Sequence, residues 1–181
     1  AMIFDPLPLK GAYEIRLERR EDDRGFFART YCDAEFAGQG LNTTWVQMNV
    51  SMSRDAGTLR GLHFQRGPAA EIKLIRCLRG RAFDVIVDLR DGSETHGAFF
   101  SLVLDQDALN AIYVPKGFAH GFQTLTADTE LQYLHSTAYA PGYEGGINPL
   151  DPDLTIDWPL PVAVMSDRDR NLPALRECAP L

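Results

Sequence analysis

Short runs in which apolar residues alternate with polar ones, or in which β-branched residues cluster, make up most of the middle of this chain. Because successive side chains of a β-strand point to opposite faces of a sheet, such runs predict strands. The clearest predicted strands span residues 73–78, 82–88, 99–104 and 111–114. Turn-forming residues cluster at 79–80, 90–93 and 115–117. This spacing is typical of an all-β sandwich or barrel.

Helical patterns are scarce. Residues 33–37 predict a short helix that ends near Gly38, and residues 105–110 predict a single turn before the next strand. From about Pro141 onward proline and glycine become dense, which predicts an extended C-terminal segment that wraps the barrel. A chain of 181 residues can bury one sizeable core but not two, so we expect one domain over 1–181.

The charge balance argues against two classes of partner. The formal net charge is −7 and the pI is near 5.0, whereas binding to nucleic acid or to a membrane surface normally requires a basic face. Any anionic ligand must therefore be bound by local arginines. No run approaches the roughly 18 apolar residues of a spanning helix, and the N-terminus lacks a basic region followed by an apolar run, so we expect a cytoplasmic protein.

The three cysteines do not indicate a disulfide framework or a thiolate zinc site. They are odd in number, widely separated and without CxxC spacing, so we interpret them as structural. They are Cys32, Cys77 and Cys178.

The candidate chemistry begins with His63, which lies in the run RGLHFQ, and with Lys73, ten residues later. On neighbouring strands the two would place a proton acceptor close to a fixed ammonium. A base can remove a proton next to a ketone only if the charge that develops on the carbonyl oxygen is stabilised, and a nearby lysine can do this. Taken alone, the pair is also consistent with a half-buried histidine and a solvated lysine.

A second histidine, His120, ends a PxGxxH motif that starts at Pro115. Proline and glycine set a tight turn there, and the histidine enters the following strand. In a small barrel such a strand can aim His120 into the mouth. Together His63 and His120 resemble the two sequence motifs of the cupin superfamily.

The metal-binding form of the cupin motif is not preserved. Metal-binding cupins carry HxH, but the position two after His63 is Gln65, and Lys73 adds a positive charge that repels a divalent cation. We therefore expect no functional metal. His96 and His135 have no partner at ligand spacing and are interpreted as surface or packing residues.

A narrower resemblance covers nearly the whole chain. Its most specific part is the run at 57–65, GTLRGLHFQ, with Lys73 correctly placed after it. The other matching positions are 23–27, 47–51, 119–122, Tyr133, 139–141, 151–152 and 166–169. They occur in the order and at about the spacing seen in dTDP-4-dehydrorhamnose 3,5-epimerases. This resemblance implies an all-β, cupin-type jelly-roll barrel with few short helices.

The resemblance also implies catalytic roles. His63 would be the base that removes protons from the carbons flanking a C4 ketone, and Asp169 would orient it. Asp167 lies two residues away and could face the same side of an extended segment, so it remains an alternative. Tyr133 would be the acid on the opposite side of the sugar, and Lys73 would stabilise the enolate oxygen.

Substrate contacts are implied for eight further positions. Arg24 and Arg60 would bind the diphosphate through paired hydrogen bonds. Gln47 and Asn49, on one face of a strand, would bind sugar hydroxyls, His120 would assist Lys73, and Tyr139 would stack on the nucleobase. Glu144 and Arg168 match further ligand-contact positions. The complete set is Arg24, Gln47, Asn49, Arg60, His120, Tyr139, Glu144 and Arg168.

Two departures from the family pattern concern recognition of the substrate. Arg29 stands where the family usually has a glutamate, and residues 145–152 lack the arginine and tryptophan that commonly follow Ile147. Both lie away from the matched proton-transfer residues. The nucleobase, and the choice between inverting one carbon or two, therefore remain open.

The resulting prediction is a cofactor-independent epimerase that inverts C3 and C5 of a nucleotide-diphospho-4-keto-6-deoxy-hexose through an enolate. The resemblance implies a homodimer with an exchanged N-terminal segment and neither a metal nor a nicotinamide cofactor. Three alternatives remain. They are a single-centre epimerase or 3,4-ketoisomerase, a catalytically silent sugar-nucleotide-binding or regulatory cupin, and a metal-dependent dioxygenase.

Overall fold

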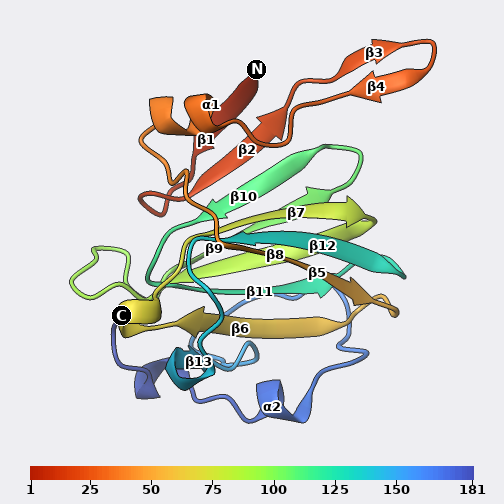
Figure 1. Cartoon of the computed structure of the whole chain (residues 1–181). Helices are drawn as coiled ribbons and strands as arrows, with labels where there is room; N and C mark the ends of the chain where they lie inside the picture. The colour runs from red at the N-terminus through yellow and green to blue at the C-terminus, as the bar shows by residue number, and fades with distance from the viewer.

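Two antiparallel β-sheets lie face to face in the computed structural model, which describes residues 1–181 (Figure 1). The predicted all-β fold and its jelly-roll barrel are confirmed. One sheet has six strands in the order β1-β2-β10-β7-β12-β5, and the other has five in the order β13-β6-β11-β8-β9. A separate two-stranded hairpin, β3-β4, projects from the six-stranded side.

The strands of the six-stranded sheet are β1 (Met2–Pro6), β2 (Tyr13–Leu17), β5 (Gln47–Ser53), β7 (Lys73–Arg79), β10 (Asn110–Val114) and β12 (Thr129–His135). Those of the five-stranded sheet are β6 (Leu59–Gln65), β8 (Arg81–Asp88), β9 (Phe99–Asp105), β11 (Phe118–Thr124) and β13 (Glu144–Gly146). The hairpin consists of β3 (Arg20–Asp22) and β4 (Gly25–Phe27). The helices are α1 (Asp33–Gly38) and α2 (Asp167–Arg170), with 3₁₀ turns at Gly67–Ala69, Pro141–Tyr143 and Leu175–Glu177.

The main core lies between the two sheets, because every second residue of each strand points inward. Ile75 of β7, Leu131 of β12 and Phe122 of β11 meet there, within a cluster of twelve buried residues. The alternation that predicted the strands from the sequence thus produces the core directly. Further along β12 and β7 the inward positions become polar, and these positions form the site described below.

Each sheet is covered on its outer face by one end of the chain. The C-terminal residues beyond Gly146 run along the five-stranded sheet, where Leu154 and Ile147 pack on Phe64 of β6 (Figure 1). Helix α1 covers the six-stranded sheet, where Phe36 packs on Ile15 of β2. This C-terminal part of the chain contains the short helix α2 and the 3₁₀ turn Leu175–Glu177.

The individual predicted elements are reproduced to within two residues at their ends. All four predicted strands form, as β7, β8, β9 and β10, and α1 ends at Gly38. Residues 106–109 form a turn between β9 and β10, closed by the Leu109 N–H donating to Asp105 O at 3.1 Å, but Leu109 has a φ of 52° and the turn is not helical. The turn after β7 requires Gly80, which has a φ of 81° that side chains with a Cβ rarely adopt.

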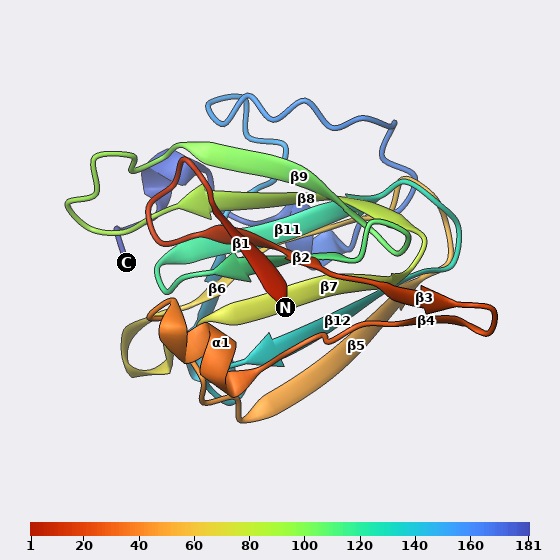
Figure 2. The same ribbon diagram turned by 90° about the horizontal axis from the view of Figure 1, so that it is seen from above.

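The hairpin β3-β4 stands clear of the barrel (Figure 2). It exposes two apolar side chains to solvent. Phe27 is 74% exposed and Phe26 is 53% exposed. The edge strand β5 also exposes Met48 and Val50. In addition, none of the helices is long and apolar enough to span a membrane.

Candidate active site

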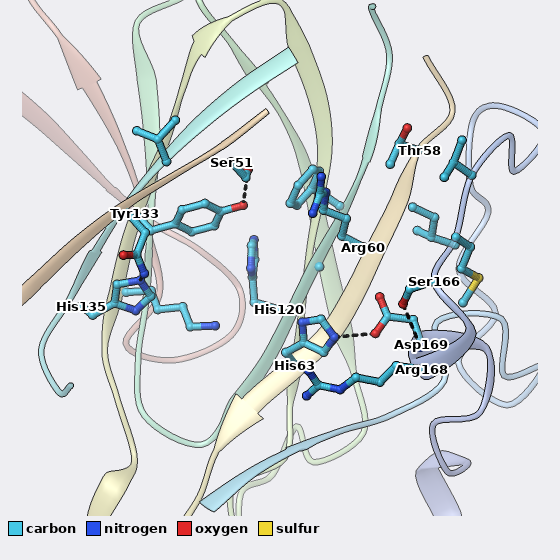
Figure 3. A pocket seen from close by; sticks show the side chains of 18 residues that line it. Ser51, Thr58, Arg60, His63, His120, Tyr133, His135, Ser166, Arg168 and Asp169 are labelled. Carbon is cyan, nitrogen blue, oxygen red and sulfur yellow. Dashed lines mark hydrogen bonds and ion pairs between the residues drawn. The ribbon is translucent and has the colours of Figure 1, made fainter. Parts of the chain in front are cut away.

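A cavity of about 550 Å³ opens between the two sheets (Figure 3). Strands β5, β12 and β7 contribute one wall, strands β6 and β11 contribute the other, and residues 164–169 close one side. It is lined by Asn49, Val50, Ser51, Thr58, Leu59, Arg60, His63, Lys73, His120, Gly121, Phe122, Tyr133, His135, Val164, Met165, Ser166, Arg168 and Asp169. All four predicted catalytic residues are therefore brought together.

His63, on β6, is hydrogen-bonded to Asp169 of α2. The Nε2 atom of His63 lies 2.6 Å from Asp169 Oδ1, and the other oxygen of Asp169 accepts from the Gly61 N–H at 3.0 Å. Because a carboxylate can only accept, the proton of the neutral imidazole sits on Nε2. The Nδ1 atom of His63 is then left with a free lone pair and can act as a base.

The electrostatics of Asp169 favour the charged form. Burial alone raises the pKa of this carboxyl group, but hydrogen bonds from His63 and Gly61 and the charges of His63 and Arg168 outweigh it and lower the pKa below its ordinary value. The carboxylate is thus ionised at neutral pH and can stabilise an imidazolium on His63.

The choice between Asp167 and Asp169 is decided by a helix rather than by a strand. The expectation of an extended segment is wrong, because residues 167–170 form α2, capped by Ser166 Oγ, which accepts from the Asp169 N–H at 3.1 Å. Residues two apart in a helix point to nearly opposite sides. Asp169 therefore faces His63 while Asp167 is exposed.

His120 also forms a histidine–carboxylate pair. His120 Nε2 lies 2.6 Å from Asp84 Oδ1, both residues are buried, and His120 is directly opposite His63 in the β11–β6 register. Burial raises the pKa of Asp84, against the effects of His120 and Lys73. The pair fixes the His120 ring at the back of the cavity.

Tyr133 reaches the cavity from β12, on the wall opposite His63 (Figure 3). Its hydroxyl lies 2.8 Å from Ser51 Oγ of β5. Burial raises the pKa of the Tyr133 phenol, although the hydrogen bond to Ser51 opposes the shift. The phenol is therefore protonated at neutral pH, as a proton donor must be.

Lys73 lines the same cavity at the start of β7. Its Nζ lies 3.5 Å from Oε1 of Glu71, and Oε2 of Glu71 lies 3.1 Å from Nδ1 of His135. Asn49, a predicted sugar contact, lies beside them with its Nδ2 atom 3.1 Å from Nε2 of His135. Gln47 and Asn49 both line an adjoining cavity of about 210 Å³, but of the two only Asn49 also lines the main cavity.

The predicted phosphate and nucleobase contacts form a polar rim. Arg60 lines the cavity and donates to Ser53 Oγ at 3.0 Å. Arg168 lies 2.7 Å from Oε1 of Glu144, whose other oxygen accepts from the Tyr139 hydroxyl at 2.9 Å. Tyr139 is exposed and borders the smaller cavity rather than the main one.

Arg24 is not brought to the cavity of its own chain. It lies at the tip of the β3-β4 hairpin, with its side chain 91% exposed, and pairs with Asp22 at 2.6 Å. Arg29, the residue that departs from the family pattern, follows the hairpin and pairs with Glu35 of α1 at 3.1 Å. Neither residue lines the pocket of the chain that carries it.

A family model described as dTDP-4-dehydrorhamnose 3,5-epimerase matches residues 6–177 of this chain. The chain belongs to this family. The dTDP-4-dehydrorhamnose 3,5-epimerase of Methanothermobacter thermautotrophicus is 43% identical over 96% of this chain and 95% of its own length. The dTDP-4-dehydrorhamnose 3-epimerase of Streptomyces niveus is 39% identical over 97% of this chain and 85% of its own length.

Solved structures of the dTDP-4-dehydrorhamnose 3,5-epimerase family share the fold. The crystal structure of the Bacillus anthracis 3,5-epimerase with TDP and PPi bound superposes with a TM-score of 0.94. It is 40% identical and covers 96% of this chain and 99% of its own. The names of the two relatives above differ in the carbons they state: the Methanothermobacter thermautotrophicus protein is named a 3,5-epimerase and the Streptomyces niveus protein a 3-epimerase.

Sequence reasoning missed four residues of the site. His135, expected from the sequence to be a surface or packing residue, packs on Tyr133 but also lines the main cavity. Its position two after Tyr133 on the same strand face could have revealed this. Asp84 could have been found as an acidic residue inside an apolar strand, but nothing marked Glu71 or Ser51. His96, by contrast, is exposed on a loop as predicted.

The residues around the cavity do not form a cluster of metal ligands. No group of three or more His, Cys, Asp or Glu side chains is arranged to hold an ion. His63 and His120 each use one ring nitrogen on a separate carboxylate. The three cysteines are unpaired, and Cys77 is buried in the main core.

Proposed function

We propose that this chain is an epimerase that inverts the carbons next to the C4 ketone of a nucleotide-diphospho-4-keto-6-deoxy-hexose. The specific reaction that we propose converts dTDP-4-dehydro-6-deoxy-D-glucose to dTDP-4-dehydro-L-rhamnose. The observation that carries the proposal is that His63, paired with Asp169, and Tyr133 reach one cavity from opposite walls. Membership of the family supports the same reaction.

The first step is removal of a proton. Nδ1 of His63 takes the hydrogen from a carbon flanking the ketone, and the electron pair of that C–H bond moves into the carbonyl group to give an enolate. The Asp169 carboxylate stabilises the imidazolium that forms. The Lys73 ammonium and the buried His120 line the cavity and stabilise the enolate oxygen.

The second step returns a proton to the opposite face of the ring. The Tyr133 phenol, protonated at neutral pH, delivers its proton to the same carbon while the enolate electron pair reforms the C–H bond. The carbon is thereby inverted and the ketone restored. Loss of the proton from His63 and protonation of the Tyr133 phenolate by water then reset the enzyme, without net oxidation or reduction.

Local guanidinium groups provide the binding site for the diphosphate. The chain carries a net charge of −7, so attraction to an anion must come from particular residues rather than from the whole surface. Arg60 and Arg168 both line the cavity and supply planar donors that fit phosphate oxygens. Tyr139, exposed at the rim, is the surface on which the nucleobase stacks.

The active form is a homodimer in which the hairpin β3-β4 of one subunit completes the cavity of the other. Exposed Phe26 and Phe27 on the hairpin, and exposed Met48 and Val50 on edge strand β5, support this assembly, because apolar groups of this kind are normally covered. Arg24 would then bind the diphosphate in the partner's site. Sedimentation of the purified protein should give twice the monomer mass.

Solvent exchange tests the reaction. The protein is incubated in deuterium oxide with dTDP-, CDP- and GDP-linked 4-keto-6-deoxy-glucose, and the label at each sugar carbon is measured by NMR. Inversion with label at C3 and C5 is expected for the dTDP sugar. Label at one carbon would instead establish a single-centre epimerase, the activity named for the Streptomyces niveus relative.

Two controls separate the remaining alternatives. His63→Asn should abolish both exchange and inversion, whereas a silent binding protein would show no activity in either form. A 3,4-ketoisomerase would move the ketone to C3, which changes the carbon spectrum of the product. Elemental analysis showing a stoichiometric metal, with activity lost on chelation, would favour the dioxygenase.

A further inference from the structure

A chain of polar contacts crosses three neighbouring strands on the cavity side of the six-stranded sheet. Lys73 of β7 contacts Glu71, Glu71 contacts His135 of β12, and His135 contacts Asn49 of β5. The strand register places His135 directly opposite Lys73 on one side and Gln47 on the other. Two residues with predicted roles, Lys73 and Asn49, are thus linked by two residues without one.

Glu71 is the anchor of this chain. Its side chain is only 8% exposed, and each of its oxygens has a separate partner, Lys73 Nζ for Oε1 and His135 Nδ1 for Oε2. A carboxylate buried to this extent requires such partners, since an unpaired charge there is costly. The ammonium of Lys73 is on a flexible four-carbon stem, so a fixed carboxylate beside it restricts where the charge can lie.

The contacts of His135 determine which way Asn49 faces. The Nδ2 atom of an amide can only donate, so Nε2 of His135 must accept, and the ring proton therefore sits on Nδ1 and is donated to Glu71. With its NH₂ group turned to His135, Asn49 presents its carbonyl oxygen as a free acceptor. The ring of His135 also stacks on Tyr133, with centroids 6.1 Å apart and an interplanar angle of 20°.

We propose that Glu71 and His135 are positioning residues for the reaction: Glu71 fixes the Lys73 ammonium at the cavity wall, and His135 orients Asn49 so that its oxygen accepts from a sugar hydroxyl. This inference rests on the proposed epimerase function. Preorganised charge next to a developing oxyanion acts on the transition state, whereas the hydroxyl contact acts on substrate binding. The two residues therefore have different kinetic signatures.

The His135 half is tested with two matched variants. His135→Phe keeps an aromatic ring on Tyr133 but removes both nitrogen contacts, and it should raise KM about 5- to 30-fold with kcat within about threefold. His135→Gln can accept from Asn49 and donate to Glu71, so its KM should stay within about threefold of the wild-type value. A KM for His135→Gln equal to or higher than that for His135→Phe would overturn this half, because a role in packing alone would favour the variant that keeps the aromatic ring on Tyr133.

For Glu71 we expect the opposite result, an effect on kcat rather than on KM. Glu71→Gln keeps the hydrogen bond to His135 but loses the ion pair with Lys73, and it should lower kcat about 10- to 100-fold with little change in KM. Glu71→Asp keeps the charge but is too short to reach both partners, and it should also lower kcat. A rise in kcat for Glu71→Gln would mean that Glu71 only weakens the charge of Lys73, which contradicts a positioning role.

A measurement without substrate separates this inference from the proposed function. In ¹⁵N-labelled protein at neutral pH, the NMR signals of His135 should show a proton on Nδ1 and none on Nε2. A protonated Nε2, in either the other tautomer or the imidazolium, would reverse the Asn49 amide and overturn the orientation assigned to it. If the wild-type protein inverts no 4-keto sugar, the proposed function fails instead, whatever the tautomer.

Discussion

The Nε2 atom of His63 lies 2.6 Å from Oδ1 of Asp169, although the two residues are 106 positions apart in the chain. The carboxylate is held in place by the Gly61 N–H and by the cap of α2, so it can orient the imidazole without moving itself. This contact ties α2 to β6 and leaves the other ring nitrogen of His63 free of the carboxylate.

Asp169→Asn should lower kcat about 10² to 10⁴-fold, because an amide can place the wrong His63 tautomer in the site and cannot stabilise the imidazolium. Steady-state rates of inversion provide the measurement. Asp167→Asn is the matched control, since Asp167 is exposed on the other side of the same helix, and its rate should match that of the wild type. Comparable losses in the two variants would argue against the pairing.

Tyr133→Phe should separate proton removal from inversion. His63 can still take the substrate proton and return a solvent deuteron to the same face, so label should enter without a change of configuration, while inversion falls about 10² to 10⁴-fold. Deuterium incorporation and inversion are measured on one sample by NMR. Tyr13→Phe on β2, away from the cavity, is the control. Inversion at the wild-type rate in Tyr133→Phe would exclude Tyr133 as the acid.

Mixed dimers should reveal whether Arg24 acts across the interface. Arg24→Ala is expected to weaken substrate binding strongly and His63→Asn to abolish turnover, but a dimer with one subunit of each has one site with both native residues. Equal mixing after reversible dissociation should restore about one quarter of the wild-type activity at low substrate concentration. If Arg24 served its own subunit, mixing would restore none.

Asp88→Asn should destabilise the fold by about 2 to 4 kcal/mol at neutral pH, measured by denaturant unfolding. Burial alone raises the pKa of Asp88, but hydrogen bonds from Arg90, Ser93 and Thr95 outweigh it and hold the pKa far below its ordinary value. The stabilisation from a lowered pKa is present above the unfolded-state value of about 3.9 and is lost as the pH falls toward the folded-state value.

The difference in the free energy of unfolding between the wild type and Asp88→Asn should therefore become smaller below about pH 4. Asp91→Asn, at an exposed neighbouring position, should unfold at nearly the wild-type denaturant concentration throughout. If this difference in the free energy of unfolding stayed constant down to pH 2, the charge of the Asp88 carboxylate could not be what stabilises the fold.

Local sequence pattern was enough to predict four of the strands and the face of each strand that is buried. Alternation is a local property, so the runs that became β7, β8, β9 and β10 could be read without knowing their partners. The same rule placed Gln47 and Asn49 on one face of β5. Family motifs then supplied the expected chemistry of His63, Lys73 and Tyr133.

Which distant side chains meet could not be predicted before the strands were placed in space. The choice of Asp169 over Asp167 depended on α2, and the place of His135 in the cavity depended on β12 lying between β5 and β7. The histidine partners of the buried carboxylates Asp84 and Glu71 come from strands remote in sequence. Strand order and register are set by packing of the whole chain, so no local pattern specifies these contacts.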